Sequence, residues 1–151
     1  MATLFSWLEA TGMATTIASS TTLTGALSAV HVVGFTLVMG GALVANLQSF
    51  GALFPRPQAI GFEASANRII LAGLAISLLT GTLLFSARAT DVSANGTFQL
   101  KMLLLIAAAL FHFAVRRRAA ARAGRARAVS AVGLALWLGL AVTACAFILL
   151  E

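Results

Sequence analysis

Residues 23–47 read LTGALSAVHVVGFTLVMGGALVANL, a stretch without a single Asp, Glu, Lys or Arg. A membrane-spanning α-helix needs about 20 mostly apolar residues to cross a hydrocarbon layer of about 30 Å, and it satisfies its backbone hydrogen bonds internally. This stretch is long enough to cross with some tilt. It therefore predicts a first spanning helix, with His31 inside it.

Three further apolar runs follow this stretch, at 69–87, 98–115 and 129–150. Charged or polar connections separate them, and the first contains the sequence Phe-Pro-Arg-Pro at 54–57. Proline ends a helix because it has no backbone N–H and restricts the residue before it. The pattern predicts four spans, joined by a loop that carries Glu63 and Arg68 and by a second loop at 88–96.

The segment 4–19 precedes the first span and is apolar, with Glu9 as its only charged residue. Trp7 is of the type that lies at the headgroup level of a membrane. The segment therefore predicts a short helix in the membrane interface. The predicted fold class is an all-α membrane protein, a four-helix transmembrane bundle with this N-terminal interfacial helix, in a single domain over 1–151.

The composition excludes an ordinary water-soluble domain. The 151 residues are 60% hydrophobic and 9% charged, whereas soluble domains carry about 25% charged residues. All the acidic residues lie outside the apolar runs, at Glu9, Glu63, Asp91 and Glu151. The apolar runs therefore contain no carboxylate, which argues against hydrolysis by paired carboxylates and against a buried carboxylate proton relay.

Basic residues predict the orientation of the chain in the membrane. Six of the ten Lys and Arg residues lie between positions 116 and 127, directly after the third run. Connections rich in Lys and Arg stay in the cytoplasm. We therefore expect the first and third connections to be cytoplasmic and both termini extracytoplasmic, in a bacterial inner membrane. The arginine run is explained by topology and by anionic lipids, so no nucleic-acid partner is expected.

Two histidines and one lysine are the informative polar residues of the apolar runs. His31 shares a helical face with small residues of the first span, so its ring should face other helices rather than lipid. His112 lies near the cytoplasmic end of the third run, and Lys101 lies on the same face near the outer end. Both histidines are candidate metal ligands, since neutral imidazole is the commonest one.

These residues lead to the hypothesis of a b-type haem protein. His31 or His112 would bind the iron, and Lys101 or Arg116 would lie near the propionates. Such a protein would transfer electrons, either linked to quinone or as the membrane anchor of a larger redox complex, rather than act as an enzyme by itself. The alternatives are a cofactor-free structural or assembly subunit and a small metal-handling transporter.

The depths of the two histidines do not match. Counted from the outer end of each span, His31 is roughly 12 Å deep and His112 roughly 21 Å deep. Three arrangements would remove the mismatch: unequal helix tilts, a homodimer that pairs equivalent histidines, or methionine as second ligand. Met39 lies nearer the depth of His112, and Met102 lies nearer that of His31.

Several short motifs together give the chain a family resemblance. They are WLEAT at 7–11, AVHVVG at 29–34, LTGTLLF at 79–85, FQLKM at 98–102 and FH at 111–112. With these motifs the chain resembles an uncharacterised family of small bacterial four-helix membrane proteins, a domain of unknown function.

The resemblance implies an architecture more than an activity. It implies an outer interfacial helix, four spans and a histidine on the first and third, at His31 and His112, with Lys101 as the lysine before methionine. A charged residue typical of the family near the end of the first span is absent, because Asn-Leu-Gln stands there at 46–48. More distantly, the arrangement is similar to b-type membrane cytochromes, which is an analogy of fold.

Overall fold

The computed structural model describes residues 2–49, 59–115 and 126–150, and in these ranges it contains helices and no strand. The predicted proline break at 54–57, Arg116 and most of the arginine run lie outside the described residues.

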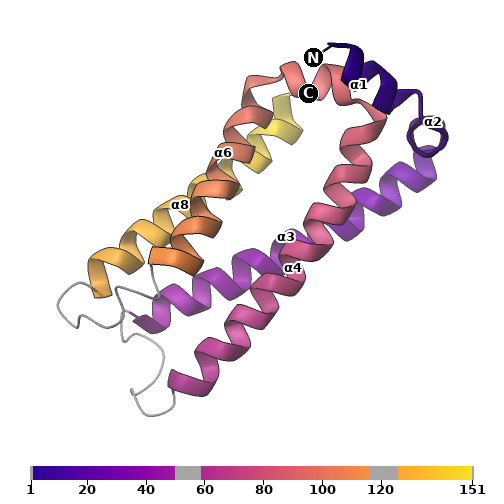
Figure 1. Ribbon diagram of the computed structural model, residues 1–151. Helices are drawn as coiled ribbons and strands as arrows, with labels where there is room; N and C mark the ends of the chain where they lie inside the picture. Colours follow the sequence, from indigo (N-terminus) through magenta and orange to yellow (C-terminus); the bar gives the residue numbers. More distant parts are fainter. Residues whose placement is uncertain (1, 50–58, 116–125, 151) are drawn as a thin grey trace. The chain divides into compact units, whose positions relative to one another are not determined.

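The described helices confirm the predicted all-α fold class (Figure 1). They are α1 (Ala2–Glu9), α2 (Gly12–Ser19), α3 (Thr21–Ser49), α4 (Ala59–Ala87), α5 (Ala89–Ala94), α6 (Gly96–Leu110), a π-helical turn η2 (Phe111–Val115) and α8 (Ala126–Leu150). Four apolar stretches of these described helices are long enough to cross a membrane: Thr21–Gln48, Glu63–Ala87, Gly96–Ala114 and Arg127–Phe147. The chain is therefore a multi-pass membrane protein.

The N-terminal segment 4–19 forms two helices instead of the single one predicted. Helix α1 ends at Glu9, and the Thr11 side chain accepts a hydrogen bond from the Ala14 backbone N–H at 3.4 Å. A threonine oxygen in this position satisfies an N–H that the first helical turn leaves without a partner. Helix α1 therefore ends at Glu9 and α2 begins at Gly12, with two residues between them.

Two predicted loops were wrong in their extent. Helix α4 begins at Ala59 rather than 69, so Glu63 and Arg68 lie on a helix. A spanning helix can continue past the hydrocarbon into the headgroup region, where charged side chains reach water. The predicted loop at 88–96 contains the short helix α5, with Arg88 before its first residue and Asn95 after its last.

Internal contacts divide the chain into two compact units, and the boundary cuts through both α3 and α4. Unit 1 contains Met1–Val38 and Leu71–Gly96, and unit 2 contains Met39–Ile70 and Thr97–Glu151.

In unit 1, the backbones of α3 and α4 approach closely through glycines. A Cβ atom added to Gly73 would lie 2.6 Å from the carbonyl oxygen of Gly34 and 2.8 Å from the backbone nitrogen of Val38. Small residues permit this approach, which replaces the hydrophobic driving force that helices lack inside lipid. The pair Gly34 and Gly73 therefore sets the spacing of the helices that carry His31 and its neighbours.

One end of unit 1 is formed by α1 lying against α5 (Figure 1). The Glu9 carboxylate accepts hydrogen bonds from the Thr90 backbone N–H at 2.7 Å and from the Thr90 hydroxyl at 3.0 Å. The rings of Phe5 and Phe85 meet edge to face, with centroids 5.9 Å apart. Two hydrogen bonds to the Glu9 carboxylate and one aromatic contact thus fasten α1 to the unit.

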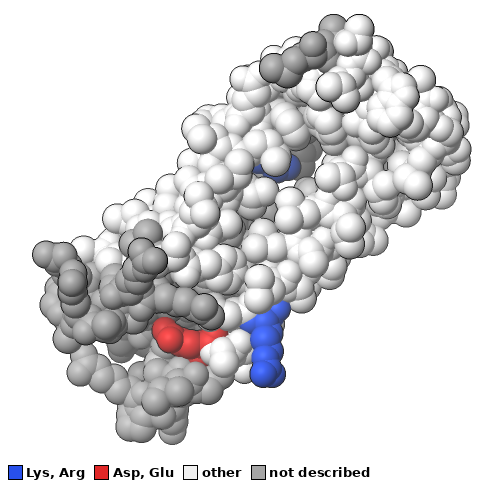
Figure 2. All heavy atoms as spheres, in the orientation of Figure 1, with Lys and Arg blue, Asp and Glu red and all other residues white. Residues whose placement is uncertain are grey.

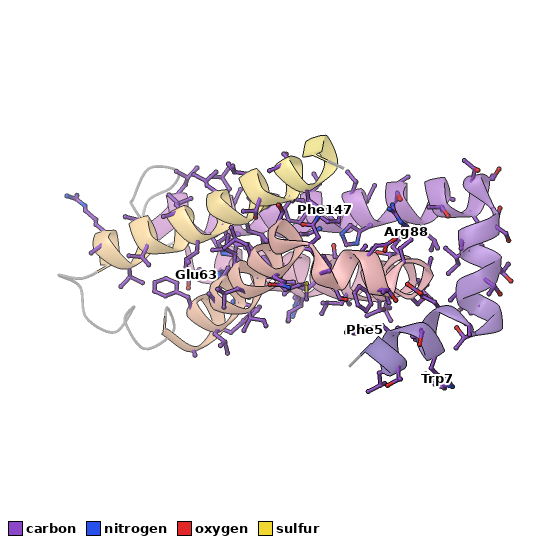
Figure 3. All side chains as sticks on the ribbon, turned by 90° about the horizontal axis from the view of Figure 1, so that it is seen from above. Phe5, Trp7, Glu63, Arg88 and Phe147 are labelled. Carbon is purple, nitrogen blue, oxygen red and sulfur yellow. The ribbon has the colours of Figure 1, made fainter. Side chains whose placement is uncertain are left out.

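The other face of the N-terminal helices is apolar and exposed. Leu4, Trp7 and Met13 are 68%, 67% and 63% exposed, and Figure 3 labels Trp7 on α1. Exposed apolar side chains around a Trp are typical of a helix that lies in a membrane interface. On the face shown in Figure 2, most of the described residues are neither Lys, Arg, Asp nor Glu.

Replacing Glu9 with alanine is expected to loosen α1. Both hydrogen bonds to Thr90 are lost, and a hydrogen bond to a charged group contributes about 1.5–3 kcal/mol before exposure to water reduces it. Amide hydrogen exchange at Thr90 should accelerate roughly tenfold, which corresponds to about 1.4 kcal/mol. Ser6→Ala on the same helix is the control, because Ser6 bonds only locally, to the Thr3 carbonyl. Equal exchange rates in the two variants would contradict the expectation.

Candidate functional site

His31 projects from α3 toward α4 and is held there by Thr80 in unit 1. The distance from His31 Nδ1 to Thr80 Oγ1 is 3.1 Å. The Thr80 hydroxyl donates its one hydrogen to the Ile76 carbonyl at 2.7 Å, so its oxygen accepts from the ring. A neutral His31 ring therefore carries its proton on Nδ1 and its lone pair on Nε2.

Glycine at position 81 makes room for this ring. A Cβ atom added to Gly81 would lie 3.0 Å from His31 Cε1 and 3.4 Å from Nδ1. One turn away, the Ser77 hydroxyl donates to the His31 carbonyl at 3.4 Å. The ring and the backbone of His31 are thus both attached to α4, which limits the orientations that the imidazole can adopt.

His112 lies in unit 2, within the π-helical turn η2 at the end of α6, and is 4% exposed. Its Nε2 lies 2.9 Å from Asn67 Oδ1 on α4. An amide oxygen only accepts, so Nε2 carries the proton and a neutral ring has its lone pair on Nδ1. The ring meets Phe113 and Trp137 edge to face, at centroid distances of 4.9 and 6.2 Å. Neutral His31 and neutral His112 are therefore opposite tautomers: the lone pair is on Nε2 in His31 and on Nδ1 in His112.

Replacing Asn67 with valine is expected to destabilise the protein by about 1–3 kcal/mol, because it leaves the buried N–H of His112 without its acceptor. Thermal unfolding in detergent measures the loss. The double variant Asn67→Val with His112→Phe is the control. It removes both polar partners and should recover part of the stability. A double variant that is less stable than both single variants would contradict this account of the pair.

The remaining predicted site residues lie in or beyond unit 2. Lys101 is half-buried on α6, with Nζ 5.7 Å from the centroid of the Phe147 ring on α8 (Figure 3). The Phe98 and Phe147 rings are 6.0 Å apart. Aromatic faces attract a cation, so Lys101 is held between α6 and α8.

The two methionines predicted as candidate second ligands are each partly buried. Met39 lies on α3 and Met102 on α6. Arg116 falls outside the described residues. Within the described ranges, no group of three or more His, Cys, Asp and Glu side chains is placed to hold a metal ion.

Sequence reasoning missed the residues that orient the histidines. Thr80 and Gly81 were visible only as a polar and small pair inside the second apolar run, and Asn67 was expected in a loop. The pair at 80 and 81 could have drawn attention as a site where another side chain packs. Nothing in the local sequence connects either position to a histidine more than 40 residues away.

The comparisons with known proteins add no relative: no family model, no curated protein and no solved structure matches the chain.

Proposed function

We propose that this chain is an integral membrane protein that binds haem b and carries electrons, with His31 Nε2 as an iron ligand. The observation that carries the proposal is the hydrogen bond from His31 Nδ1 to Thr80. Ligating histidines donate their other ring N–H to a neighbouring acceptor, which fixes the tautomer and the ring orientation. The hydrogen bond at Nδ1 therefore fits a histidine that would bind iron through Nε2.

The surroundings of His31 suit a haem in a second respect. The ring is attached to α4 through Thr80 and packs on Gly81, which restricts the orientation of the imidazole. When bound, haem supplies one-electron redox chemistry, while the protein supplies ligation and surroundings. Lys101, a cation in a largely apolar span of unit 2, is a candidate for stabilising an anionic group such as a propionate.

His112 fits less well as the second ligand. Its Nε2–H is used by Asn67, and its lone pair lies on Nδ1, the nitrogen next to the helix backbone. The second ligand would instead be His31 of a second copy related by a two-fold axis. Haem in such a dimer would bind with one haem for two chains.

The proposal extends to the orientation of the chain. The arginine-rich connection at 116–127 would face the cytoplasm of a bacterial cell and both termini the opposite side, following the distribution of Lys and Arg. The exposed positions of Arg68 on α4 and Arg127 on α8 suit charged ends of this kind. Membership of the family of small four-helix bacterial membrane proteins named above is part of the same proposal.

A second candidate function is a cofactor-free structural or assembly subunit. The packing of His112 favours it, because a ring that bonds Asn67 and contacts Trp137 locks helices together without any ligand. In that case His31 and Thr80 would form a second interhelical lock.

A reduced-minus-oxidised absorption spectrum separates these two functions. The full chain is expressed with haem synthesis supported, purified in mild detergent and reduced with dithionite. The expected result is the sharp absorption change of a b-type haem, with a stoichiometry that reports one or two chains per haem. A folded protein that shows no such band, even after haem is added, would contradict haem binding and favour the structural subunit.

A further inference from the structure

Two buried side chains of unit 2 each present a polar atom without a hydrogen-bond partner. They are Asn46 on α3 and Trp137 on α8, and each is 1% exposed. The atoms without partners are Asn46 Oδ1 and Trp137 Nε1. The first is an acceptor and the second a donor. Leaving either atom unpaired away from water costs free energy, so a binding partner for both would stabilise the unit.

Helix geometry places Asn46 and Trp137 near the same stretch of α8. Asn46 Oδ1 lies 2.6 Å from the position that a Cβ atom on Gly133 would occupy. Gly133 and Trp137 are four residues apart, so they share one face of the helix. A helical side chain leans back over the turn before its own Cα, which brings the indole toward Gly133. The Asn46 amide is already anchored, because its Nδ2 donates to the Ala42 carbonyl at 2.7 Å.

A partner for both atoms must accept from the indole, donate to the amide and carry no charge. The polar residues of unit 2 that the structure describes as buried include no Lys, Arg, Asp or Glu: they are Asn46, Gln48, His112 and Ser130. A buried ion would find no counter-charge among these side chains, and an unpaired buried charge is strongly unfavourable.

We infer that Asn46 and Trp137 bind a neutral hydroxyl group between them, whose oxygen accepts from Trp137 Nε1–H and whose hydrogen is donated to Asn46 Oδ1. The hydroxyl comes from a water molecule or from the tip of a quinol headgroup entering from the membrane. Both sources present the same chemistry to the protein. The site uses no atom of His31, so it stands or falls independently of haem binding.

Vibrational spectroscopy of the indole tests the site directly. The chain contains two tryptophans, so Trp7→Phe leaves Trp137 as the sole reporter. Ultraviolet resonance Raman spectra of this variant, in nanodiscs of quinone-free lipid, report whether the indole N–H is hydrogen-bonded. A hydrogen-bonded signal without quinone identifies water. A signal that appears only after a short-chain benzoquinol is added identifies the quinol. An unbonded indole under both conditions would overturn the inference.

An isosteric variant gives a second measurement. Trp137→3-benzothienylalanine replaces the N–H by sulfur at nearly constant shape, and the same replacement at Trp7 is the matched control. We expect the melting temperature to fall by about 3–6 °C for position 137 and to stay unchanged for position 7. Combining the change with Asn46→Ala should add little further loss, because one hydroxyl serves both residues. An unchanged or raised melting temperature at position 137 would speak against a bound hydroxyl.

Discussion

Replacing Gly73 with alanine is expected to lower the free energy of unfolding by about 1–3 kcal/mol, or more if the helices cannot separate. The added Cβ atom would lie 2.6 Å from the Gly34 carbonyl oxygen and 2.8 Å from the Val38 backbone nitrogen. Both contacts are backbone atoms, so no side-chain rotation can relieve them. The helices α3 and α4 must move apart, which loosens the packing that substitutes for the hydrophobic effect in lipid.

Thermal unfolding in detergent measures this loss, and Gly25→Ala on α3 is the matched control. A Cβ atom on Gly25 meets nothing within 4 Å, and alanine is the better helix former by about 0.5–1 kcal/mol. The control should therefore unfold at the same or a higher temperature. If Gly73→Ala behaves like Gly25→Ala, the close approach of the two helices is not a feature of the protein in solution.

Replacing His31 with alanine is expected to abolish the haem absorbance of the purified protein, since it removes the proposed iron ligand. Thr80→Val should leave haem bound but weaken its binding by about 10–100-fold, which is the usual effect of removing the partner of a ligating histidine. The reduction potential should also shift, because Nδ1–H loses its acceptor. Spectroscopic redox titration of the three proteins measures both effects.

His112→Phe is the matched control for these variants. Because His112 bonds Asn67 and packs beside Trp137, its replacement should lower the melting temperature while the haem spectrum remains. Haem that survives in His31→Ala but is lost in His112→Phe would transfer the ligand role to His112. That result would contradict the tautomer argument developed from Thr80.

The spans could be predicted from the sequence because each is a local property. The run at 23–47 has no charged residue, and a chain in lipid must satisfy its backbone hydrogen bonds within each segment. The ends of the helices were predicted less well. Helix α4 begins at Ala59, ten residues before the predicted start of the span. Charged side chains such as Glu63 do not end a helix where they can reach water. Helix α5 was missed because six residues carry too little periodicity to be recognised.

The candidate site was predicted in part. The positions of His31 and His112 on spanning helices followed from the sequence, and their small neighbours indicated that the rings face other helices. Their partners did not follow, because Thr80 lies 49 positions from His31 and Asn67 lies 45 positions from His112. Asn46 and Trp137 were not recognised as a pair, since each is an ordinary residue in its own helix.

The sequence by itself determined that this chain is a membrane protein, how many of its helices can span the membrane and which few polar residues lie within those helices. These properties depend on the free energy of transferring each segment from water to lipid. That free energy is set by the residues of the segment itself. Only the tertiary structure decided which residues orient the two histidines and which buried polar atoms, Asn46 Oδ1 and Trp137 Nε1 among them, are left without a hydrogen-bond partner. Those properties depend on hydrogen bonds between helices, whose register is set by glycine contacts such as Gly34 with Gly73.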